Sequence, residues 1–243
     1  MHEISIKAET IFHIGHFEVS NSLLLAVCAL VLILVVAVII RFKLALVPER
    51  LQGFVEMIFE ELLTLMDSVL GDRSRSLKYF PLIASIFLFV VISSWLGLLP
   101  LGPLTIHHAP LFRAPTTDLN FTIALAIISV LSVNILGVVA IGFWKHMGKF
   151  FNFRSPIMLF VGLLELVSEF VKIISFSFRL FGNIFAGEVL LVILAFIVPY
   201  WASYVVPLPF LFLEVFVGVI QGFIFAMLTL VFISMATNLE ANH

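Results

Sequence analysis

Charged side chains are scarce in this chain. Lys, Arg, Asp and Glu make up 12% of its 243 residues and hydrophobic residues 62%, whereas soluble domains carry about 25% charged residues. The composition therefore predicts a polytopic membrane protein, most simply a single membrane domain over residues 1–243. The chain also lacks a basic tract, so nucleic acid is not an expected partner.

Cysteine is nearly absent, and histidine is confined to predicted tails and loops. The single cysteine, Cys28, excludes an intrachain disulfide and a Cys-rich metal site. The histidines lack metal-ligand spacing on a shared helix, so we expect no metal and no cofactor. They are His2, His13, His16, His107, His108, His146 and His243. Residues 1–21 are too acidic for a secretory or transit signal, and we interpret them as a polar tail on the outer side.

Lysine and arginine are absent after Arg179. This last guanidinium lies deep in an apolar segment, where a charge costs several kcal/mol and cannot escape by deprotonation. A chain that keeps an arginine there is expected to use it.

Five long apolar stretches predict an all-α fold with five transmembrane helices, at 22–40, 80–99, 121–143, 156–198 and 208–237. We expect Thr117 or Asp118 to cap the third helix. A fully helical fourth stretch would be about 64 Å long, against a hydrocarbon core of about 30 Å. The fifth is also over-long, so the last two helices are expected to form a strongly tilted hairpin.

Residues 49–70 predict an amphipathic helix, with apolar side chains at helical spacing and acidic ones elsewhere. We interpret it as an interfacial helix without chemistry, ended by Gly71 and Asp72. No internal repeat supports an inverted-repeat transporter.

Basic residues mark two of the loops. Arg41, Lys43, Arg50, Arg73, Arg75 and Lys78 lie between the first two spans, and Lys145, Lys149 and Arg154 follow the third. Arg113 alone marks the loop between the second and third. With five spans both basic loops fall on one side, which predicts an outer N-terminus and a cytoplasmic C-terminus.

Charges inside the predicted membrane segments are confined to the last two. They are Glu165, Glu169, Lys172, Arg179, Glu188 and Glu214. Lys172 and Arg179 share a helix face about 10 Å apart, and Asn183 lies one turn beyond Arg179. The predicted orientation puts Glu165 on the cytoplasmic side, Glu188 and Glu214 nearer the outside, and Gln221 at the depth of Arg179.

This pattern predicts one acidic zone on each side, with a fixed positive charge between them that opposes direct proton passage. Protons would then need a carrier, such as a carboxylate on a mobile neighbouring protein, that exchanges its proton near Arg179. A channel role is favoured over a structural ion pair for Glu165, Glu188 and Glu214. For Glu169 and Lys172, a helix-surface ion pair and a channel role stay equally open. Asn183 and Gln221 could also be interhelical hydrogen-bonding groups.

The run from Arg179 to Asn183, followed by Ala186-Gly187-Glu188, resembles the signature of the a subunits of F-type ATP synthases. Four further segments are similar to this family: Pro81-Leu82-Ile83 with Leu96 to Pro100, Thr117 to Asn120, Leu164 to Ser168, and Ile220 to Phe225. The family varies between His and Glu at positions 188 and 214; two glutamates resemble bacterial members.

The resemblance implies a non-catalytic proton-channel stator subunit with two offset half-channels that load and unload the rotating c-ring. Arg179 would face the c-ring carboxylate and separate the half-channels. Asn183, Glu188, Glu214 and Gln221 would line the outer one, and Glu165 and Ser168 the cytoplasmic one. Implied partners are the c-ring, the stator b subunits, membrane lipid and, indirectly, the catalytic sector, in a bacterial inner membrane.

Other function classes remain in competition. A stand-alone transporter is disfavoured by the central arginine, and a membrane scaffold would need Arg179 for assembly only. A membrane enzyme is disfavoured by the placement of the histidines. ATP chemistry must belong to partners, because no phosphate-loop spacing follows Gly148-Lys149. The choice between protons and sodium ions stays open.

Overall fold

The computed structural model describes residues 10–14, 17–42, 44–45, 50–99, 105–106, 109–110, 113–150, 156–199, 202 and 205–237. Several residues discussed above lie outside these ranges: His2, His16, Lys43, His107, His108, Arg154 and His243. Within them the chain is almost entirely helical: α1 (Asn21–Phe42), α2 (Arg50–Leu70), α3 (Arg73–Leu98), α4 (Leu119–Ile141), α5 (Phe143–Phe150), α6 (Pro156–Ile197) and α7 (Leu208–Thr237). The protein is therefore an all-α polytopic membrane protein.

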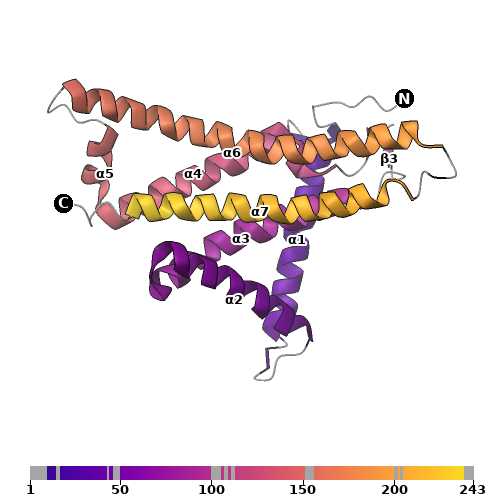
Figure 1. The fold of residues 1–243 in the computed structure, drawn as a ribbon, viewed down its shortest axis with the longest axis horizontal. Coiled ribbons are helices and arrows are strands. Elements are labelled where there is room, and N and C mark those ends of the chain that lie inside the picture. Colours follow the sequence, from indigo (N-terminus) through magenta and orange to yellow (C-terminus); the bar gives the residue numbers. More distant parts are fainter. Residues whose placement is uncertain are drawn as a thin grey trace.

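Four helices of the described residues are long and apolar enough to cross a membrane, namely α1, α3, α4 and α7. The expected fourth span, 156–198, corresponds to α6, which is one helix of 42 residues and is not among those four. It carries five charged side chains, which distinguishes it from its apolar neighbours. In Figure 1, α6 and α7 run side by side along the longest axis of the molecule, and α1 crosses this direction steeply.

The core lies where α7 packs against α3, α4 and α6. Met66 of α2, Ile83 and Val90 of α3, and Leu230 and Ile233 of α7 are fully buried there. Two buried hydroxyl pairs cross the helix interfaces: Thr122 with Ser177 at 3.0 Å and Ser129 with Thr229 at 2.7 Å. Such pairs satisfy polar groups that have no water to bind.

Helix α3 begins at Arg73, seven residues before the expected boundary at 80. The carboxylate of Asp72 accepts a hydrogen bond from Ser74 N at 3.1 Å, which caps an earlier helix start. Pro81 consequently lies inside α3 rather than at its beginning. Gly71, with φ +72°, ends α2 as the sequence predicts.

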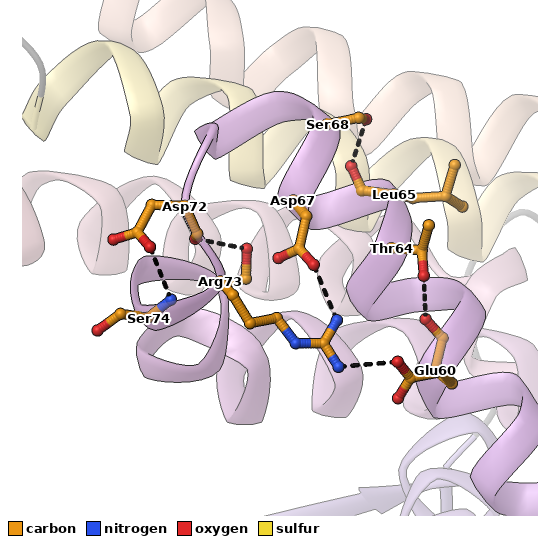
Figure 2. Close-up of polar contacts among 9 residues, drawn as sticks. Glu60, Thr64, Leu65, Asp67, Ser68, Asp72, Arg73 and Ser74 are labelled. Carbon is orange, nitrogen blue, oxygen red and sulfur yellow. Dashed lines mark hydrogen bonds and ion pairs between the residues drawn. The ribbon is translucent and has the colours of Figure 1, made fainter.

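At the junction of α2 and α3, the guanidinium of Arg73 binds two carboxylates of α2 (Figure 2). Arg73 Nη1 donates to Asp67 Oδ2 at 2.8 Å and Nη2 donates to Glu60 Oε1 at 2.9 Å. These two charge-assisted bonds link α2 to the first residue of α3 through partly exposed side chains.

The start of α4 is fixed by Asp118, which decides between the two cap candidates. Its carboxylate accepts from Asn120 N at 3.0 Å and from Ser22 Oγ of α1 at 2.7 Å. A short 3-10 turn, η1 (Pro115–Thr117), precedes it. Asp118, which directly follows η1, therefore connects the N-terminal ends of α1 and α4 by hydrogen bonds, close to the site described below.

Four short strands and one short helix were not expected. β1 (Thr10–Ile14) pairs with β2 (Phe17–Ser20) in an antiparallel hairpin within the predicted N-terminal tail. β3 (Thr105–Ile106) pairs with β4 (Ala109–Pro110) in the loop before η1. Helix α5 occupies the basic loop after α4.

Candidate functional site

A cavity of about 120 Å³ lies between α3, η1, α6 and α7. Its walls are mostly apolar, with two carboxylates among them; the lining residues are Ser94, Leu98, Ala114, Thr117, Ile184, Glu188, Leu191, Val192 and Glu214. A water molecule needs only about 10–15 Å³ on this measure of volume. The cavity can therefore hold several water molecules next to both glutamates.

Each of the two carboxylates that line the cavity, Glu188 and Glu214, has one buried oxygen without a hydrogen-bond partner among the described residues. Glu214 is 6% exposed, and among the described residues neither Glu188 Oε2 nor Glu214 Oε2 has a hydrogen-bond partner. Leaving a buried carboxylate oxygen without a partner is costly unless water or a bound proton reaches it. Two such groups around a hydratable cavity suit the transfer of a proton or small cation.

Gly187 allows Glu214 to lie against α6. A Cβ atom at position 187 would lie 2.6 Å from Glu214 Oε1 and 2.9 Å from its Cδ. The absence of a side chain on α6 therefore makes room for a carboxylate from α7.

Arg179 lies on a different, open face of α6. It is exposed, together with Ser175, Gly182, Asn183 and Ala186 on the same side of the helix. Its Nη2 reaches Ser175 Oγ at 3.5 Å. Of the carboxylates that the structure describes, none forms an ion pair with it.

The register of α6 against α7 brings Arg179 and Gln221 to the same level. Gly187 meets Glu214 at one point, and the rings of Phe176 and Phe225 lie 4.9 Å apart at another. In two antiparallel helices, residues between these contacts lie opposite one another. Gln221 is 5% exposed, whereas Arg179 points outward.

The remaining predicted residues lie toward the N-terminal end of α6. Glu165 is half-buried and Ser168 is exposed. At the helical rise, Ser168 is about 30 Å from Glu188 along the axis. Glu169 and Lys172 form an ion pair, with Nζ 2.7 Å from Oε1. The structure thus joins Glu188 with Glu214 and leaves Glu165 and Ser168 in a separate zone.

Three residues of interest were not assigned by the sequence. Ser94 and Thr117 both line the cavity, although the sequence predicts only a possible cap for Thr117 and nothing for Ser94. The sequence predicts His146 in a loop, whereas it belongs to α5 and is 3% exposed. No local pattern marks these residues, because each reaches its place through helix packing. Among the described residues, no cluster of three potential metal ligands occurs.

Comparison with known proteins identifies the relatives of this chain. The sequence model of the family described as ATP synthase A chain matches residues 22–234. The chain is 36% identical over 206 residues to ATP synthase subunit a of Campylobacter concisus (strain 13826), which covers 84% of this chain and 83% of that protein. It is 35% identical over 235 residues to ATP synthase subunit a of Campylobacter jejuni subsp. doylei (strain ATCC BAA-1458 / RM4099 / 269.97), covering 96% and 91%.

A third relative, ATP synthase subunit a of Campylobacter curvus (strain 525.92), is 33% identical over 210 residues, covering 86% of this chain and 87% of that protein. The family match extends over the residues that line the cavity, over Arg179 and over nearly all of the helices that carry them. The chain belongs to the ATP synthase A chain family.

Proposed function

We propose that this chain is the proton-channel stator subunit of a bacterial F-type ATP synthase, with no catalytic activity of its own. The observation that carries the proposal is the pair of unpartnered carboxylates, Glu188 and Glu214, at a hydratable cavity, with Arg179 on a separate open face. The cavity serves as part of an outer half-channel, and the open face of α6 receives the c-ring.

The mechanism follows from the separation of these features. Protons reach Glu188 and Glu214 through water in the cavity and pass toward the c-ring carboxylate beside Asn183 and Gln221. Arg179 favours the ionised form of that carboxylate when it arrives, so the proton is released there. The same positive charge blocks direct passage between the two zones.

The second half-channel is proposed at the N-terminal end of α6, with Glu165 and Ser168 at its entrance. A proton crossing 100 mV releases about 2.3 kcal/mol. Several protons must therefore be combined through rotation of the c-ring before the catalytic sector can make ATP.

The proposed membrane arrangement has five spans, with α6 as the fourth and α6 and α7 as a tilted hairpin. Its support is the length of α6 and the steep crossing of α1 over the α6–α7 direction (Figure 1). The N-terminus lies outside and the C-terminus in the cytoplasm of a bacterial cell with an inner membrane. Stator b subunits and lipid complete the surroundings.

ATP-driven acidification of inverted membrane vesicles tests this function. Arg179→Ala is expected to abolish acidification while native gels show a normally assembled complex, because the half-channels lose the charge between them. Normal acidification by the variant would refute the proposal. Loss of assembly would instead favour a scaffold role for Arg179.

A further inference from the structure

A series of hydrogen-bonded side chains connects α5, α4 and α6 away from the cavity. His146 Nε2 lies 3.2 Å from Asn134 Oδ1, and Asn134 Nδ2 donates to Glu169 Oε2 at 3.2 Å. Glu169 Oε1 accepts from Lys172 Nζ at 2.7 Å. Because Asn134 Nδ2 also donates to Val130 O at 2.9 Å, its Oδ1 is the acceptor and His146 Nε2 carries the proton.

The two residues at the ends of this hydrogen-bonded series, His146 and Lys172, also contact other helices. His146 lies against Gly137, where a Cβ atom would be 2.9 Å from His146 Cε1. At the other end, Lys172 Nζ lies 4.6 Å from the ring centroid of Phe232 on α7. The side chains of Glu169 and Lys172 are 15% and 19% exposed. The ammonium group is thus drawn toward α4 and α7 and away from the open face.

The ion pair changes the charge that α6 presents. Lys172 and Arg179 are the two Lys or Arg residues of this helix, about 10 Å apart along its axis. Glu169 neutralises Lys172, whereas no described carboxylate forms an ion pair with Arg179. The uncompensated positive charge on α6 is therefore concentrated at Arg179.

We propose that Glu169, held in place by Asn134 and His146, neutralises Lys172 so that Arg179 acts as the single effective cation on this helix. Asn134 and His146 are positioning residues in this scheme. The inference rests on the proposed function, because it concerns a carboxylate that exchanges its proton beside Arg179. Without Glu169, the charge on Lys172 would repel entering protons and disfavour protonation of that carboxylate from the cytoplasmic side.

The test compares pH profiles of ATP-driven acidification in inverted vesicles, where the bath contacts the cytoplasmic face. Rates are normalised to uncoupled ATP hydrolysis, and assembly is checked on native gels. Glu169→Gln is expected to move the midpoint toward acid by about one pH unit, which is tenfold in proton concentration. Glu169→Gln combined with Lys172→Met removes both charges and should return the midpoint to that of the wild type. Lys172→Met alone should show no acid shift.

A wild-type midpoint in Glu169→Gln, or an equal acid shift in the double variant, would overturn the inference and leave a purely structural ion pair. If Glu169→Gln does not assemble, a displaced midpoint in the double variant still overturns the inference, because that variant carries no charge at either position. Arg179→Ala measured in parallel separates the two proposals. If it pumps normally, the proposed function fails; if it is inactive while Glu169→Gln is unshifted, only the present inference fails.

Discussion

The carboxylate of Glu214 occupies the space that a side chain at position 187 would need. In Gly187→Ala the new methyl group would meet Glu214 Oε1 and Cδ, at 2.6 and 2.9 Å before relaxation. The carboxylate is the flexible end of its side chain, so we expect it to move rather than the helices. Displacement of a reacting group by about 1 Å costs up to about 100-fold in rate.

We therefore predict that Gly187→Ala slows ATP-driven proton pumping by at least about tenfold while the complex assembles normally. Vesicle acidification and native gels measure the two quantities. Gly148→Ala is the matched control, because nothing lies within 4 Å of a Cβ atom there. Wild-type pumping by Gly187→Ala would contradict the role of the Glu214 position.

Glu214 also illustrates the cost of placing an acid in an apolar environment. Its Oε2 is buried without a hydrogen-bond partner among the described residues. Replacing it with Leu removes an unsatisfied polar atom, so Glu214→Leu should raise the free energy of unfolding by about 1–3 kcal/mol. The same change should abolish pumping. Thermal unfolding of the detergent-solubilised complex measures this change in stability, and Glu214→Gln is measured for comparison. An unfolding temperature of the Leu variant below that of the wild type would count against this account.

At the scale of elements, we expect the stability of the junction between α2 and α3 to depend on the ionisation of Asp67. The hydroxyl group of Ser76 and the guanidinium of Arg73 lower the pKa of Asp67 from its ordinary value of 3.8. A carboxyl group with a lowered pKa in the folded state stabilises that state above its unfolded pKa. This contribution is lost as pH falls through the folded pKa.

We predict that the contact between α2 and α3 weakens as pH falls through the pKa of Asp67, which lies below its ordinary value of 3.8. Hydrogen exchange in residues 70–76 measures this, with wild type and Asp67→Asn compared at the same pH. The variant should exchange faster near neutral pH and resemble wild type in acid. Equal exchange at neutral pH would show that the two bonds of Arg73 do not stabilise the junction between α2 and α3.

At the scale of the whole molecule, glycines on α7 set the distance to α3. A Cβ atom at Gly222 would lie 2.7 Å from Val91 Cγ2 and 3.2 Å from the backbone oxygen of Phe87. One turn earlier, a Cβ atom at Gly218 would lie 3.2 Å from Ser94 Cβ. Small residues at such positions let helix backbones approach closely in a membrane.

Gly222→Ala should therefore lower the free energy of unfolding by about 1–3 kcal/mol, because the Val91 side chain and the Phe87 carbonyl of α3 would have to move. Thermal unfolding of the purified protein in detergent measures this cost. Gly148→Ala again serves as the control in open space. An unchanged unfolding temperature in Gly222→Ala would show that the α3–α7 interface adapts without strain.

Much of this architecture follows from local sequence patterns. Apolar runs predict α1, α3, α4 and α7, and amphipathic spacing predicts α2, because hydrophobicity and helical period are properties of neighbouring residues. The start of α3 is harder to predict from the sequence. Pro81 is typical of a first helical turn, whereas the helix begins at Arg73, capped by Asp72. No local sequence pattern predicts the hairpin of β1 and β2 or helix α5.

Local sequence patterns establish that the chain is a helical membrane protein, that the charges inside its predicted membrane segments are confined to the last two, and which family it resembles. Which charges meet depends on how the helices pack: Glu188 and Glu214 share a cavity, Lys172 pairs with Glu169, and Arg179 stays on an open face. Helix packing also brings Ser94 and Thr117 to the cavity and buries His146 beside Asn134. The physical reason is that helical period fixes the face of a residue, whereas its neighbours depend on how distant helices pack.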